Sequence, residues 1–140
     1  MFQMTIGEIL ANGPNWFKDE EPHVYIVCDG DIVFYVGRSD SIVNRILAHL
    51  SDMPTGGPDS ILGQFIEANF PNSESWQVEV WTLEDCRPLV TQIFPTLQRW
   101  GIDIAEQAVI RYFCPFFNRT GNPEAQSLLS SRYVFPCSVE

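Results

Sequence analysis

The chain has little positive charge. Its 140 residues include 18 acidic and 8 basic side chains, Lys18 is the only lysine, and the net charge is −10. Nucleic-acid-binding proteins usually carry a basic face, because contacts to phosphates supply much of their affinity. The composition therefore argues against tight binding of free DNA over the whole surface. It does not exclude one positively charged groove on an acidic body.

The chain also lacks paired cysteines and long apolar runs. Four scattered cysteines, without a Cys-x-x-Cys pair, argue against a zinc site and a disulfide framework and indicate reduced thiols. No apolar run approaches the length of a membrane span, and the N-terminus has no basic region followed by an apolar core. We expect a single domain over 1–140 that is cytoplasmic and makes no contact with a membrane.

What the sequence does contain is organised around residues 24–50. Two apolar runs, 24–27 and 32–36, flank an Asp-Gly-Asp step, which is a strong signal for a β-hairpin. Apolar residues then recur at helical spacing from Ile42 to Leu50, with Ser39 or Asp40 as the predicted cap. The pattern predicts a strand-turn-strand-helix unit.

Four reactive side chains belong to this unit. The predicted hairpin carries Tyr25 and Tyr35, and the helix carries Arg45 and His49. Residues four apart on a helix point the same way, so the guanidinium and the imidazole share one face. We therefore expect two phenols, a guanidinium and an imidazole near one end of a small sheet.

The remaining segments predict an α/β (α+β) fold with a small central, mostly antiparallel sheet of three strands flanked by helices. The strands are predicted at 23–29, 31–37 and 76–82. Helices are predicted after Thr5 in a capping box, from Asp59 or Ser60 as cap through 61–66 and ending before Phe70-Pro71, over 87–100 with a kink at Pro95, and over 104–113 with Asp103 as cap. Residues 1–22 are interpreted as a structural cover, 52–75 as an insertion, and 133–135 as an edge strand or a strip laid over the core.

These segments resemble the GIY-YIG nuclease domain. His23-Val24-Tyr25 stands at the first motif and Tyr35-Val36-Gly37 at the second, followed by Arg45 and His49. The second part of the resemblance is the string from Glu106 to Ile110, with Pro115 and Asn118 beyond it. The motif core covers about 23–50 and 103–121. The glycine of the first motif is replaced here by His23.

The resemblance implies an endonuclease that hydrolyses DNA phosphodiester bonds with Mg²⁺ or Mn²⁺. Glu106 would hold the metal, and Asn118 would anchor the backbone or the phosphate. Arg38, Arg45 and Arg119 would bind phosphate, with His49 assisting proton transfer. A phenol has a pKa near ~10, which a metal or Arg45 can lower. We favour Tyr35 as the general base and Tyr25 as the residue that orients water or phosphate, although the sequence does not decide between them.

Each of these residues also has a structural interpretation. Glu106 could close a capping box with Asp103, the tyrosines could only pack, Arg45 could be solvated or pair with Glu8 or Asp40, and His49 could favour a helix dipole. Asn118 could be a turn residue. For the whole domain, the alternative is a catalytically silent binding or regulatory module that acts through a protein partner. A third possibility is that a partner chain supplies the DNA affinity.

Overall fold

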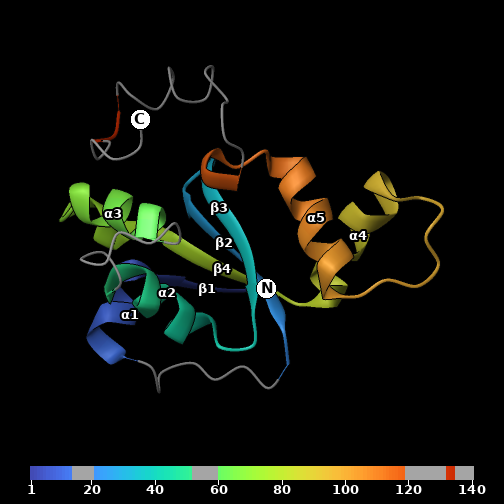
Figure 1. Cartoon of the computed structure of the whole chain (residues 1–140), viewed down its shortest axis with the longest axis horizontal. Coiled ribbons are helices and arrows are strands. Elements are labelled where there is room, and N and C mark those ends of the chain that lie inside the picture. The colour runs from blue at the N-terminus through green and yellow to red at the C-terminus, as the bar shows by residue number, and fades with distance from the viewer. Residues whose placement is uncertain (14–20, 52–59, 119–131, 135–140) are drawn as a thin grey trace.

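The computed structural model describes residues 1–13, 21–51, 60–118 and 132–134. They form an α+β fold in which helices cover both faces of a four-stranded antiparallel sheet of order β1-β4-β2-β3 (Figure 1). The strands are β1 (Phe2–Thr5), β2 (His23–Asp29), β3 (Ile32–Ser39) and β4 (Gln77–Trp81). The helices are α1 (Ile6–Asn12), α2 (Ile42–Ser51), α3 (Ser60–Ala68), α4 (Leu83–Ile93) and α5 (Ile102–Phe113), with short 3₁₀ turns η2 (Asn72–Ser75) and η3 (Phe116–Asn118).

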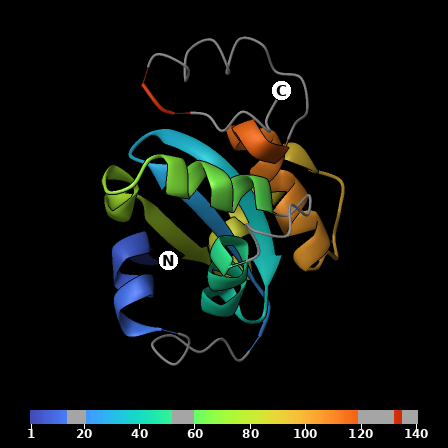
Figure 2. The ribbon, with the colours of Figure 1, turned by 60° about the vertical axis from the view of Figure 1, so that its left-hand side comes forward.

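The sheet divides the core into two apolar clusters. Helices α1, α2 and α3 lie on one face, and α4 and α5 lie on the other (Figures 1 and 2). The first face is aromatic, because Phe34, Phe65 and Trp76 pack with ring centroids 4.5–5.2 Å apart. The second face is filled by smaller side chains such as Val24, Val36 and Ala108. Both faces of β2 are therefore buried, which explains its continuous apolar run.

The predicted hairpin is confirmed, and it contains an irregularity that the sequence does not reveal. Gly30 takes a positive φ of 60° in the turn, a conformation that suits glycine. Cys28 pairs with Val33 but Val27 pairs with Tyr35, so Phe34 is an extra residue in β3. This bulge shifts the register by one residue. As a result Val27 and Tyr35 are cross-strand partners, as are Tyr25 and Gly37.

The predicted three-stranded sheet is incomplete. A fourth strand, β1, pairs antiparallel with β4, with Met4 opposite Val78. It is four residues long and buries one side chain fully, so its hydrophobic alternation is too short to stand out in the sequence. The capping box predicted at Thr5 is confirmed, and α1 follows it directly. Residues 1–13 are thus part of the sheet and its cover.

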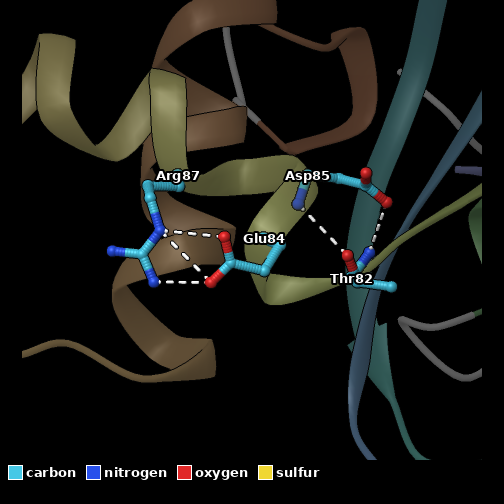
Figure 3. Close-up of polar contacts among 4 residues, drawn as sticks. All are labelled: Thr82, Glu84, Asp85 and Arg87. Atoms are coloured by element: carbon cyan, nitrogen blue, oxygen red, sulfur yellow. Dashed lines mark hydrogen bonds and ion pairs between the residues drawn. The ribbon is translucent and has the colours of Figure 1, made fainter.

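The helix predicted over 87–100 is wrong at both ends. Thr82 caps α4 because its Oγ1 accepts a hydrogen bond from Asp85 N (3.1 Å) and Asp85 Oδ2 accepts one from Thr82 N (2.9 Å) (Figure 3). The helix ends at Ile93, since Phe94 has non-helical backbone angles immediately before Pro95. Pro95 therefore terminates the helix and does not kink it.

Helix α5 begins earlier than predicted, with Gly101 at the N-cap position in place of Asp103. Its predicted end is confirmed, because Cys114 adopts the left-handed conformation before Pro115. The strip predicted to lie over the core is confirmed at Tyr133, which is buried against Phe34 and Trp76. Residues 52–59 of the expected insertion lie outside the described residues. Cys28, Cys86 and Cys114 are free thiols, and the described helices include none with the length and apolar character that a membrane crossing requires.

Candidate active site

The centre of the candidate site is Tyr25 in the middle of β2. Its side chain is 1% exposed, and its ring lies over the backbone of Gly37 on β3. A Cβ atom at Gly37 would lie 2.6 Å from Cζ and from the hydroxyl oxygen of Tyr25, closer than such atoms can approach. Glycine is therefore needed at this position because the phenol occupies the space of a side chain. The ring is aimed along the sheet toward β3, the edge strand.

The hydroxyl group of Tyr25 joins three elements. It hydrogen-bonds with Arg45 from α2 and with Tyr35 from β3. The rings of Tyr25 and Tyr35 lie 5.9 Å apart with an interplanar angle of 42°. Burial raises the pKa of Tyr25 well above its ordinary value, with a further increase from Tyr35 and a decrease from Arg45. Tyr25 is consequently a neutral hydrogen-bonding group at physiological pH.

Helix α2 places Arg45 and His49 on the same side of the sheet as the tyrosines. Its apolar stripe, including Ile42 and Ile46, is buried in the aromatic cluster. His49 is 4% exposed, and its ring makes an edge-on contact with Tyr35 at a centroid distance of 5.8 Å. The predicted proximity of the two phenols, the guanidinium and the imidazole is therefore present.

The position of His49 depends on a close helix contact. Gly63 on α3 lies against the His49 backbone, and a Cβ at Gly63 would collide with the His49 carbonyl oxygen. Only a residue without a side chain allows α2 and α3 to approach so closely. Gly63 was not among the predicted site residues. Its only sequence signal is a single glycine within an apolar helix, and such a glycine is often tolerated without a packing role.

Asn118 holds the edge strand. Its Oδ1 accepts a hydrogen bond from Val36 N and its Nδ2 donates one to Val36 O, both at 2.8 Å. Val36 lies between Tyr35 and Gly37, so the Asn118 amide bonds to the backbone of β3 in the middle of the second motif, on the outer side of the sheet. The interpretation of Asn118 as an anchor for the site backbone agrees with this geometry, whereas a simple turn residue would not contact β3.

Glu106 and Arg38 form a second set. Arg38, the residue after Gly37, is ion-paired with Asp103 and has its Nε 3.8 Å from Glu106 Oε1. The Glu106 side chain is 23% exposed, and burial raises its pKa while Arg38 lowers it. Asp103 thus uses its carboxylate on Arg38, and Glu106 does not close a capping box with it. The i, i+3 spacing of the two carboxylates was a signal for this shared partner.

The two sets approach β3 from opposite faces of the sheet. Tyr25, Tyr35, Arg45 and His49 lie on the face covered by α2, and Glu106 extends from α5, which covers the other face. Among the described residues no strand lies beyond β3, and Asn118 pairs its outer edge at Val36, so the two sets lie on opposite sides of this edge strand and do not meet in one pocket. Arg119, predicted to bind phosphate, lies outside the described residues.

The carboxylates do not form a complete metal cage. Within the described parts of the chain, no group of three or more His, Cys, Asp and Glu side chains could hold a metal ion. A single half-buried carboxylate suits Mg²⁺, which keeps several water ligands and prefers oxygen donors. Glu106 is chemically compatible with such a ligand, and its binding of Mg²⁺ stays a prediction.

Comparison with known proteins gives no assignment. The chain matches no protein-family model, no curated protein and no solved structure.

Proposed function

We propose that this chain is a divalent-metal-dependent endonuclease that hydrolyses DNA phosphodiester bonds with a site of the GIY-YIG type. The observation that carries the proposal is the packing of Tyr25 onto Gly37 with its hydroxyl bonded to Tyr35 and Arg45. A buried tyrosine that served only the core would need one partner for its hydroxyl. Here the hydroxyl gathers a second phenol and a cation, which is a set suited to an anionic substrate.

In this proposal the scissile phosphate lies across the edge of β3 at Gly37. Arg45 hydrogen-bonds the non-bridging oxygens and stabilises the charge that develops on them. Tyr35, as the phenolate, takes a proton from the attacking water, whose oxygen bonds to phosphorus. The bond between phosphorus and the 3′ oxygen breaks in line, and the departing oxygen takes a proton from solvent. Tyr25 orients the water or the phosphate, since its raised pKa favours the neutral phenol. His49 takes the proton onward from Tyr35, against whose ring it packs.

Glu106 is the proposed ligand of Mg²⁺ or Mn²⁺. The bound ion would supply positive charge at the departing 3′ oxygen. Arg38 would then exchange its contact with Glu106 for a phosphate oxygen, since Asp103 and Glu106 hold the guanidinium beside the motif glycine. Asn118 keeps this edge of the sheet in place through Val36.

The direct test is nicking of supercoiled plasmid with Mg²⁺ or Mn²⁺, with a chelator as control. Glu106→Ala, Tyr35→Phe and Arg45→Ala should each lower the rate by roughly 100-fold or more, with thermal unfolding close to that of the wild type. Glu67→Ala is the matched control, because Glu67 is an exposed carboxylate on α3. Metal-dependent nicking at the normal rate by Glu106→Ala would overturn the assignment of the site.

The net charge of −10 and the isoelectric point of about 4.4 favour a second candidate. A catalytically silent domain of the same fold could use its acidic surface to bind a basic protein partner. Absence of nicking with either metal, together with saturable binding to a basic protein, would support this candidate. Nicking that requires an added protein chain would instead indicate that the partner supplies DNA affinity, and DNA binding by the domain alone would then be weak at moderate salt.

A further inference from the structure

The connection between α4 and α5 crosses the whole helical layer. The two helices pack side by side, and residues 94–101 leave α4 at one end and return to begin α5 at the other (Figure 1). Two arginines fasten this crossover. Arg111 near the end of α5 lies over the Phe94 ring at 4.8 Å, and Arg87 near the start of α4 lies over the Trp100 ring at 5.2 Å.

This part of an acidic chain contains almost no carboxylates. Residues 86–102 and 107–118 include no Asp or Glu, although the chain carries 18 of them. Three exposed arginines lie in the same two segments: Arg87, Arg99 and Arg111. We call residues 94–101 with Arg111 the crossover face.

The carboxylates nearest to the crossover face in the chain already have cationic partners. Glu84 is held by Arg87 in a two-pronged ion pair, with Nη2 to Oε1 at 2.7 Å and Nε to Oε2 at 3.1 Å (Figure 3). Asp103 and Glu106 pair with Arg38. Arg99 and Arg111 therefore give the crossover face a positive character on an otherwise acidic chain.

We propose that the crossover face binds a single-stranded segment of nucleic acid. Arginine stacked on an aromatic ring offers both a cation for phosphate and a planar surface for a base. Proteins that hold single strands combine the same two elements. Leu97 supplies exposed apolar surface for an unpaired base, beside the half-buried Phe94 and Trp100 rings that carry the arginines. The inference rests on the proposed nuclease function, because α5 carries both Arg111 and Glu106.

A single strand fits this surface better than a duplex. The bases of a duplex are stacked on each other and present no face to an aromatic ring, whereas unpaired bases do. The net charge of −10 also opposes a long duplex lying against the acidic body. The substrate class implied is therefore DNA with an unpaired segment, such as a flap, a gap or a displaced strand.

The test is binding of a fluorescent oligothymidylate and of a duplex of equal length, measured by anisotropy over a range of salt in the presence of chelator. We expect the wild type to bind the single strand more tightly. Arg99→Ala should weaken this binding about threefold and reduce the salt slope by about 0.7. Arg132→Ala is the matched control, since Arg132 is an exposed arginine that pairs with Asp29 at the turn of the hairpin and is not part of the crossover face.

A second pair of variants tests the charge of the crossover face at an exposed position, where a substitution should not change the stability of the fold. Gln98 is exposed on the crossover, so Gln98→Glu should weaken binding of the single strand and Gln98→Lys should strengthen it. Equal binding by both Gln98 variants, or tighter binding of the duplex, would overturn the inference. The chelator removes the divalent metal, so the assay measures binding alone and does not depend on cleavage. Single-strand binding without nicking would leave the crossover face in place and reject the nuclease, while nicking without such binding would do the reverse.

Discussion

The ring of Tyr25 occupies the volume that a side chain at Gly37 would fill. The ring carbon Cε1 would be 2.8 Å from a Cβ at Gly37, and Cζ and the hydroxyl oxygen would be 2.6 Å away. Tyr25 and Gly37 are also cross-strand partners on β2 and β3. The phenol and the glycine of the two motifs therefore act as one packed unit, and the remaining groups of the candidate site are arranged around it.

Gly37→Ala should consequently displace the Tyr25 ring. We expect a loss of about 1–3 kcal/mol in the free energy of unfolding, because extra volume in a packed region forces strain on its neighbours. Plasmid nicking should fall together with stability. Urea unfolding measures the loss of stability. Gly101→Ala is the control for crowding, because a Cβ there meets nothing within 4 Å and only the preference for glycine at the N-cap of α5 is lost. An equal loss in both variants would contradict the packing argument.

Gly63→Ala should separate α2 from α3. The added methyl group would collide with the backbone carbonyl of His49, which cannot rotate away as a side chain can. We expect a destabilisation of about 3 kcal/mol or less if the helices move apart, with reduced nicking because His49 moves with the helix. Thermal unfolding would show this as a lower midpoint. An unchanged midpoint would mean that the helices do not pack as closely as described.

Asn118→Ala should loosen the edge of β3. The change leaves Val36 N and Val36 O without the amide that bonds both of them, and an unsatisfied backbone group costs about 1–3 kcal/mol. Asn118→Asp keeps an acceptor for Val36 N but places a carboxylate oxygen against Val36 O. Both variants should lower urea stability and nicking. If Asn118→Asp behaved like the wild type near neutral pH, the donated bond to Val36 O would be absent.

Asp85 should make stability depend on pH in acid. The pKa of Asp85 lies below its ordinary 3.8, chiefly because Asp85 accepts a hydrogen bond from the Thr82 backbone. The folded state thus binds the proton less tightly than the unfolded state. The stabilisation is fully present above the unfolded pKa and is lost as pH falls through the lowered folded pKa.

Asp85→Asn is the variant that measures this effect. It should reduce the free energy of unfolding by about 0.5–2 kcal/mol near pH 7, and the difference from the wild type should shrink at pH values below 3.8. Glu84→Gln is the control, since Glu84 pairs with Arg87 on the exposed surface, where ion pairs contribute little. A difference that stays constant down to pH 2 would show that the charge of Asp85 has no role.

Local sequence signals predicted the elements that depend on short-range interactions. The Asp29-Gly30 step marked the hairpin turn, Thr5 marked the start of α1, and Cys114-Pro115 marked the end of α5. The capping box at Thr82 was visible by the same rule, but Thr82 was assigned to the end of the third predicted strand, 76–82. The strand β1 was missed because its burial depends on β4, which lies far away in the chain.

The sequence by itself determined which reactive groups are available: two phenols, a guanidinium, an imidazole, an amide and a carboxylate in a fixed order. It could not determine on which face of the sheet they lie. Without the extra residue Phe34, Tyr25 would pair with Val36, and Tyr35 would point to the face opposite Tyr25. Only the tertiary structure decides this, because a bulge that shifts the register by one residue is set by packing of the Phe34 ring against Phe65 and Trp76.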